Sequence, residues 1–176
     1  MTQKKIIFFD GDGTLWYPKM TKRREKPHWI YFDKKVKNPT KLLTVTPTTI
    51  STLTRLKKMG VILAVLSTHP RVLLDSSAVI NGKLKHLKLG HFFDEVHATK
   101  EYFSSKGKFM VKILRKYGIP KSHALMVGDK YDWDYKPAQN NGIDALLMES
   151  DYEKQHPIGK KVKRTIKQLN GVFDYI

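Results

Sequence analysis

The most constraining feature of this sequence is the segment at residues 5–16, K-I-I-F-F-D-G-D-G-T-L-W. Its apolar residues 6–9 are typical of a short buried strand, which ends in Asp10 and Asp12, separated by one glycine. Two carboxylates so close together repel each other, and no cap or turn requires both of them. We therefore expect a polar functional site where this strand ends.

Short apolar runs along the chain predict buried strands, with helix-like segments between them. The predicted strands cover residues 5–9, 61–66, 93–97, 123–127 and 143–148. The predicted helices cover about 47–59, 70–89, 106–117, 135–141 and 160–170. This alternation predicts an α/β fold in which a central parallel sheet is covered by helices on both faces. In such sheets ligands bind at the carboxyl ends of the strands.

Two helix boundaries carry more specific signals. Thr46 is the expected cap of the first helix, with Pro47 at its first position and Gly60 as its stop. The dipeptide Asn81-Gly82 could break the second helix.

Residues 16–45 interrupt the alternation, because they are too many for a simple connection between a strand and its helix. Aromatic and basic residues alternate there, and residues 28–32 are expected to form one strand of a short hairpin. We expect a single domain over residues 1–176, with this segment as a small lid insertion.

The chain is strongly basic, with 33 Lys and Arg against 16 Asp and Glu and a net charge of +17. Bases are densest at residues 17–41, where nine oppose two acids, and at 160–167, which hold five. Two interpretations remain open: attraction to polyanions such as nucleic acid, or a lysine-rich solvated surface.

Composition also bounds the compartment. Cysteine is absent, which excludes disulfides and thiolate metal sites. Apolar runs are too short to cross a bilayer, and the start lacks the pattern of a secretory signal. We expect a cytoplasmic protein without a membrane partner, and its oligomeric state stays open.

Polar residues gather where the predicted strands end. Carboxylates follow the first and fourth strands, hydroxyls close the second, and lysines precede the third long helix. In chain order these residues are Asp10, Asp12, Ser67, Thr68, Lys106, Lys108, Asp129, Asp132 and Asp134. Oxygen ligands without cysteine favour a hard cation, and Mg²⁺ is the usual one where phosphate is bound.

The order of these residues resembles the four motifs of the haloacid dehalogenase superfamily. D-G-D-G-T resembles its first motif, D-x-D-x-T, and Ser67 resembles the second. Lys106 or Lys108 resembles the third, and G-D-x-x-x-x-D at 128–134 resembles the fourth. The layout is similar to the magnesium-dependent phosphatases without a large cap. The resemblance implies a Rossmann-like three-layer sandwich and Mg²⁺-dependent hydrolysis of phosphomonoesters.

The resemblance also implies a role for each residue. Asp10 would take the phosphoryl group, and Asp12 would protonate the leaving oxygen and then deprotonate water. The metal would be held by Asp10, Asp12 (through its backbone carbonyl), Asp129 and Asp134, the last preferred over Asp132. The phosphate would be bound by Thr14, Ser67, Thr68 and Lys106, the last preferred over Lys108 for its spacing from Gly118. His69 could border the pocket, and Trp16 is either a residue that overhangs the site or a core aromatic.

The substrate stays open at this stage. An open cleft under a small lid suits small phosphorylated metabolites or phosphoprotein. An alternative is a nucleotide or nucleic-acid-end phosphatase that uses residues 17–41, where aromatics could stack on bases. A third possibility is a basic nucleic-acid-binding protein with a vestigial phosphatase site.

Overall fold

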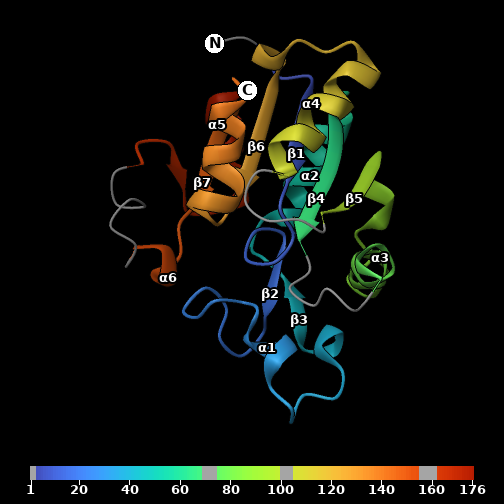
Figure 1. Cartoon of the computed structure of the whole chain (residues 1–176), viewed down its shortest axis with the longest axis vertical. Coiled ribbons are helices and arrows are strands. Elements are labelled where there is room, and N and C mark those ends of the chain that lie inside the picture. Colours follow the sequence, from blue (N-terminus) through green and yellow to red (C-terminus); the bar gives the residue numbers. More distant parts are fainter. Residues whose placement is uncertain (1–2, 69–74, 100–104, 155–161) are drawn as a thin grey trace.

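The computed structural model describes residues 3–68, 75–99, 105–154 and 162–176 (Figure 1). At its centre is a six-stranded sheet in the order β5-β4-β1-β6-β7-β8, and all its strand pairs are parallel. The strands are β1 (Ile6–Phe9), β4 (Ile62–Thr68), β5 (Glu95–Thr99), β6 (Ala124–Gly128), β7 (Asp144–Met148) and β8 (Thr165–Ile166). The predicted α/β class with a central parallel sheet is confirmed.

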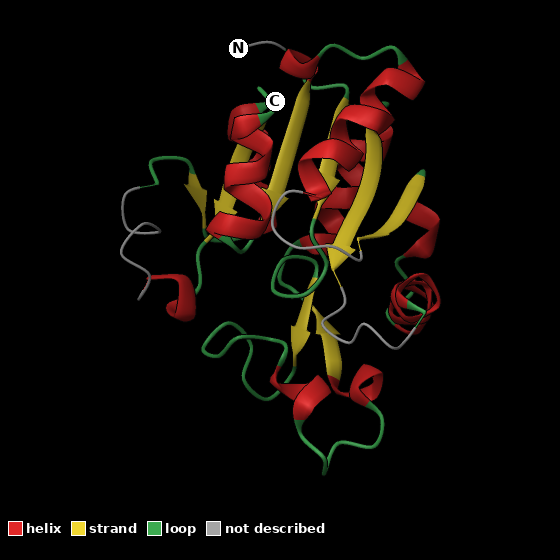
Figure 2. Cartoon of the chain, viewed as in Figure 1, coloured by secondary structure: helices red, strands yellow, loops and turns green. Residues whose placement is uncertain are grey.

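Helices cover both faces of the sheet (Figure 2). One face carries α2 (Thr49–Lys58), α3 (Ser76–His86) and the 3₁₀ helix Leu169–Tyr175, and the other carries α4 (Ser105–Tyr117) and α5 (Lys136–Asn140). Alternation along β1 explains the two layers, because Ile7 and Phe9 enter one apolar cluster and Ile6 and Phe8 enter the other. Shorter helical turns are α1 (Trp29–Phe32), α6 (Asp151–Lys154), Pro39–Leu42, Gly90–Phe92, Lys121–His123 and the π turn Tyr131–Tyr135.

The insertion, residues 16–45, forms a separate hairpin below the sheet in Figure 1. Its strands β2 (Trp16–Pro18) and β3 (Leu43–Val45) pair antiparallel. The predicted strand at 28–32 is wrong, because Trp29–Phe32 form helix α1. The β-favouring side chains misled the prediction: Ile30 and Tyr31 are buried as neighbours on one helical turn, whereas a strand would bury alternate residues.

Helix α2 begins two residues later than predicted. Its cap is Thr48, in a left-handed conformation with φ 63°, and Gly60 ends it with φ 73° as expected. Thr46 does not cap the helix. Its hydroxyl instead donates to the Thr14 carbonyl oxygen at 2.7 Å, and tertiary contact therefore overrides the local capping signal.

Helix α3 also begins later than predicted, at Ser76. Its cap is Asp75, whose carboxylate accepts from the backbone N–H groups of Ser77 and Ala78. The helix continues through Asn81-Gly82 without a break. The expected start at Pro70 lies in residues 69–74, outside the described part of the chain.

The helix predicted at 160–170 is wrong over residues 162–170. Thr165 and Ile166 form β8, which pairs with the end of β7, and the 3₁₀ helix follows from Leu169. Burial of Ile166 beside Leu169 favours an extended edge strand over a basic surface helix. Throughout the described ranges, each helix is too short or too polar to cross a membrane.

Candidate active site

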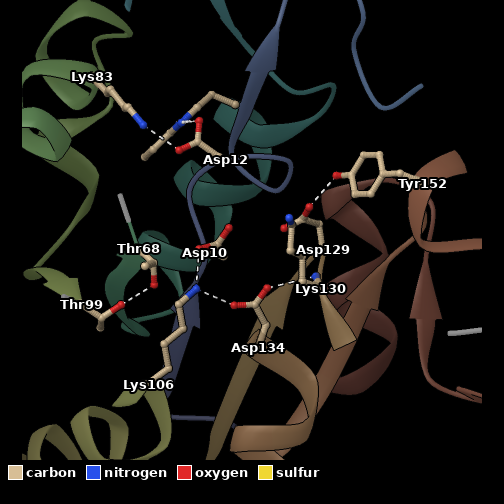
Figure 3. A network of polar contacts seen from close by, with 11 residues as sticks. Asp10, Asp12, Thr68, Lys83, Thr99, Lys106, Asp129, Lys130, Asp134 and Tyr152 are labelled. Carbon is tan, nitrogen blue, oxygen red and sulfur yellow. Dashed lines mark hydrogen bonds and ion pairs between the residues drawn. The ribbon is translucent and has the colours of Figure 1, made fainter. Parts of the chain in front are cut away.

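Three aspartates meet beyond the carboxyl ends of β1 and β6 (Figure 3). These strands are neighbours in the sheet, and the Asp10 N–H donates to the Val127 carbonyl oxygen at 2.9 Å. One carboxylate oxygen from each of Asp10, Asp129 and Asp134 lies within 4.8 Å of the others, and all three side chains are buried. Residues separated by more than a hundred positions therefore form one acidic cluster.

Lys106, at the start of α4, lies against this cluster. Its Nζ is 2.5 Å from Asp10 Oδ1 and 2.5 Å from Asp134 Oδ1, and the side chain is buried. Lys108 is exposed, because residues two apart on a helix point in nearly opposite directions. Of the two candidate lysines, Lys106 is the one placed beside Asp10.

The electrostatics of the cluster favour a cation. Burial raises the pKa of Asp10 to about 6, with Lys106 opposing and Asp134 adding to the rise. Burial, then the charges of Asp10 and Asp134, raise the pKa of Asp129 well above its usual value. Burial disfavours the Lys106 cation, but the neighbouring carboxylates outweigh it and raise its pKa. One lysine thus leaves negative charge at the cluster uncompensated.

The cluster fits a divalent metal ion. Asp129 Oδ1 is buried and has no hydrogen-bond partner among the residues that the structure describes, while Asp129 Oδ2 accepts from the Tyr152 hydroxyl. A buried carboxylate oxygen without a partner is costly, and a hard cation would satisfy it. Asp134 Oδ2 accepts from the Lys130 N–H at 3.1 Å. Asp132, the weaker candidate, is half-buried and lies 3.8 Å from Lys136 on the neighbouring turn.

The two glycines of D-G-D-G-T allow the loop to approach its neighbours. A Cβ on Gly13, which has φ 90°, would lie 2.3 Å from Asp129 Oδ2. A Cβ on Gly11 would lie 2.7 Å from Ser67 Oγ. Glycine is therefore needed to bring the loop against the ends of β6 and β4.

The Asp12 side chain does not join the acidic cluster but faces the insertion and α3. Its Oδ1 accepts from the Trp16 indole at 3.0 Å and the Tyr31 hydroxyl at 2.6 Å, and its Oδ2 accepts from Lys83 Nζ at 2.6 Å. Burial acts to raise the pKa of Asp12, but Lys83 and His28 outweigh burial and lower it. Burial lowers the pKa of His28 to about 4, so this histidine is neutral near pH 7.

The predicted phosphate-binding hydroxyls lie at the same edge of the sheet. Thr14 is fully buried, and its Oγ1 has no hydrogen-bond partner among the described residues. Ser67 is buried beside Gly11, and Thr68 Oγ1 is 2.5 Å from Thr99 Oγ1. His69 lies outside the described residues. Trp16 is completely buried, and its indole N–H donates to Asp12 Oδ1, so it packs as a core aromatic against the loop that carries Asp12.

Sequence reasoning missed the partners of two aspartates. Lys83 binds Asp12, and a signal for it existed, since it shares the buried face of α3 with Ile80 and Leu84. A lysine on an apolar helix face indicates a buried charge partner. Tyr31 and Tyr152 had no comparable signal, because their positions depend on how the insertion and α6 pack against the loop after β1.

This combination of fold and site is accompanied by a clear family match. The chain belongs to the haloacid dehalogenase-like hydrolase family, whose model matches residues 4–148. The resemblance inferred from the ordered motifs is confirmed.

Two curated relatives are both named glyceraldehyde 3-phosphate phosphatase. The one from Methanothermobacter thermautotrophicus is 34% identical over 114 residues, which are 62% of this chain and 47% of the relative. The one from Methanocaldococcus jannaschii is 33% identical over 138 residues, which are 77% of this chain and 58% of the relative. The matches thus span about half the length of these relatives.

Solved structures share the fold at low sequence identity. A HAD phosphatase from Thermococcus onnurineus has a TM-score of 0.70 and 20% identity, covering 98% of this chain and 97% of that one. A haloacid dehalogenase-like hydrolase from Streptococcus pneumoniae has a TM-score of 0.74 and 17% identity, covering 99% of both chains. These similarities confirm the HAD-like three-layer fold.

Proposed function

We propose that the chain is a Mg²⁺-dependent phosphomonoester hydrolase that works through a phosphoaspartate at Asp10. The observation that carries this proposal is the buried acidic cluster at the end of β1, with Lys106 within 2.5 Å of Asp10. A carboxylate at this position has a cation beside it and a neighbouring acid, Asp12, on the same loop. Structural needs alone do not account for so many buried charges.

In the first half-reaction an oxygen of the Asp10 carboxylate attacks phosphorus, and the bond from phosphorus to the leaving oxygen breaks. The electron pair stays on the leaving oxygen, which takes the proton of Asp12 and departs as an alcohol. The lowered pKa of Asp12 favours its ionised form at rest. A bound phosphate dianion opposes that form by like-charge repulsion and so promotes protonation of Asp12.

In the second half-reaction Asp12 removes a proton from water, and the water oxygen attacks phosphorus. The bond from phosphorus to Asp10 breaks, and its electron pair restores the Asp10 carboxylate. Inorganic phosphate leaves, and Asp12 again carries a proton. The acid of the first step thus serves as the base of the second.

The remaining residues bind and orient. Asp10, Asp129 and Asp134, with the Asp12 carbonyl, would hold Mg²⁺, which supplies positive charge against the repulsion between phosphate and carboxylates. Lys106 would neutralise the transferred group. The phosphate oxygens would accept hydrogen bonds from the hydroxyls of Thr14, Ser67 and Thr68.

For the substrate we propose small phosphorylated metabolites or phosphoprotein. The curated relatives support a small phosphorylated substrate, since both are named glyceraldehyde 3-phosphate phosphatase. The shorter length of this chain leaves the choice of metabolite to experiment.

The test is turnover by wild type and Asp10→Asn of 4-nitrophenyl phosphate, phosphorylated metabolites and a phosphopeptide, each with Mg²⁺ added or chelated. We expect Mg²⁺-dependent release of phosphate by wild type and a loss of at least about 10³-fold in Asp10→Asn. Retention of activity by a folded Asp10→Asn protein would refute the phosphoaspartate route.

A second candidate function is hydrolysis of terminal phosphates on nucleic acid. One observation favours it: the insertion exposes eight cations that form no ion pair with any described residue. These are Lys19, Lys22, Arg24, Lys26, Lys34, Lys35, Lys37 and Lys41. Exposed Phe32 beside them could stack on a base.

A further inference from the structure

We propose that Lys83 is a positioning residue that, together with Tyr31 and Trp16, fixes the Asp12 carboxylate for proton transfer to the leaving oxygen. This inference rests on the proposed phosphatase function. It adds a role for a helix and for the insertion, neither of which carries a motif residue of the site.

The first support is the set of hydrogen bonds on Asp12. Both of its carboxylate oxygens are bonded: Lys83 Nζ donates to Oδ2 at 2.6 Å (Figure 3), and Tyr31 and Trp16 donate to Oδ1 at 2.6 and 3.0 Å. Three donors from three elements restrain the orientation of the carboxylate. An acid that must meet a leaving oxygen within hydrogen-bond distance gains from such restraint.

The second support is the burial of Lys83. Its side chain is completely buried on α3, where an apolar residue would pack without the cost of removing an ammonium group from water. Its Nζ also lies 4.4 Å from the centre of the Tyr31 ring, so the cation contacts both Asp12 and one of the other donors to Asp12. Leucine at position 83 would avoid this cost, but it would not supply the cation that binds Asp12.

The third support is the origin of the donors. Lys83 comes from α3, Tyr31 from α1 in the insertion, and Trp16 from β2. These elements are held together at Asp12. The position of the Asp12 carboxylate therefore depends on how both α3 and the insertion pack against it.

The test uses two kinds of monoester. Protonation of the leaving oxygen matters greatly for an alkyl phosphate such as glycerol 3-phosphate, and little for 4-nitrophenyl phosphate, whose leaving group is a weak base. The quantity compared is kcat/KM, which covers the steps up to departure of the leaving group. Lys83→Met shortens the side chain by one heavy atom and removes its charge, and Lys85→Met, at an exposed position on the same helix, is the control.

We expect Lys83→Met to lower kcat/KM for the alkyl phosphate about 10²-fold and for the aryl phosphate less than about 5-fold. Tyr31→Phe removes only the hydroxyl and should show the same selectivity with a smaller loss. If Lys83→Met fails to fold, the selectivity of Tyr31→Phe for the alkyl phosphate tests the positioning role on its own. Lys85→Met should match wild type on both substrates.

Equal losses on the two substrates in both folded variants would overturn the positioning role, since a structural defect does not distinguish leaving groups. Failure of the proposed function would look different. In that case wild type would turn over neither monoester, or Asp10→Asn would retain activity, and the positioning role would fall with it.

Discussion

Three carboxylates are buried close together at the end of β1, and removing them from water costs free energy. Asp10, Asp129 and Asp134 are nearly inaccessible and close enough to repel one another, and Lys106 is the buried cation bonded to two of them. In the absence of a metal ion, the folded state therefore favours protonation of part of the cluster. This preference has a measurable consequence for stability.

Asp10 should lower the stability of the metal-free protein as the pH rises from about 4 to about 6. Its pKa is raised from 3.8 to about 6, so in this interval Asp10 binds more protons in the folded than in the unfolded state, and its contribution to the free energy of unfolding falls with rising pH. His28 contributes in the opposite direction, because its pKa is lowered from 6.5 to about 4. Asp10→Asn should therefore make stability rise more with pH than it does in wild type, whereas Asp151→Asn, at an exposed carboxylate, should not. Thermal unfolding in a chelator from about pH 4 to about pH 6 measures this difference, and the same pH dependence in wild type and Asp10→Asn would contradict the prediction.

Asp129→Asn should stabilise the metal-free protein near pH 7 and remove its response to Mg²⁺. The substitution relieves repulsion at a carboxyl whose pKa is raised well above its usual value, mainly by burial. A gain of about 1 kcal/mol corresponds to roughly 2–4 °C in a protein of this size. Wild type should instead gain stability as Mg²⁺ is added. A Mg²⁺-induced shift in the variant equal to that of wild type would exclude Asp129 as a ligand.

The meeting of Asp10, Lys106 and Asp129 followed from the sequence, because parallel strands and the helices after them share one edge of the sheet. The surroundings of Asp12 did not follow. Lys83 reaches it from a helix, and Tyr31 from a turn that was predicted as a strand. Contacts of this kind depend on packing between elements, which local patterns do not encode.

The insertion packs directly against the D-G-D-G-T loop, and its structure was predicted only in part. Its first strand begins at Trp16, just after the D-G-D-G-T loop, and the Gly13 N–H donates to the Trp16 carbonyl oxygen at 2.7 Å. Arg23 donates from Nε to the Gly13 carbonyl oxygen at 3.2 Å. Two hydrogen bonds therefore connect the insertion directly to the loop that carries Asp10 and Asp12.

Reversal of charge in the insertion should affect a polyanionic substrate and leave a small one unchanged. The insertion variant changes three exposed residues to Glu: Lys34, Lys35 and Lys37. The control variant changes the net charge by the same amount on the exposed face of α4, at Lys108, Lys112 and Arg115. With 5′-phosphorylated single-stranded DNA, binding by wild type should weaken about tenfold or more between 50 and 200 mM salt if three phosphates are contacted.

The insertion variant should lose most of this salt dependence, and turnover of glycerol 3-phosphate should not change. The α4 variant should behave as wild type with both ligands. Equal effects of the two sets would mean that general charge, rather than the insertion, governs binding, and the second candidate function would lose its support.

Strong periodic elements were predicted well, and short ones were not. The apolar run at 61–66 became β4, and the amphipathic segment at 106–117 became α4 with Gly118 closing it at φ 62°. Strand β8 has only two residues in a lysine-rich stretch, so its pairing with β7 decides its conformation. Tertiary pairing of this kind outweighs local propensity.

The molecule as a whole carries a net charge of +17, and this excess works against its compact state. Its thermal stability should therefore rise as NaCl increases from 10 to 150 mM, since the screening length falls from about 30 to about 8 Å. Relief of about 1 kcal/mol would raise the midpoint by roughly 2–4 °C. Calorimetry checks this, with sodium acetate as a control for specific anion binding. A falling midpoint would show that attractive ion pairs dominate.

The contact between Gly13 and Asp129 restricts how such a protein can change. With φ 90° and a Cβ position 2.3 Å from Asp129 Oδ2, residue 13 has neither the backbone freedom nor the space for a side chain. Alanine at position 13 would require the Asp129 carboxylate to move and the backbone to leave its positive φ. The loop after β1 and the residue that follows β6 pack against each other at the position that a side chain on residue 13 would need. A larger residue at position 13 therefore requires a compensating change at Asp129.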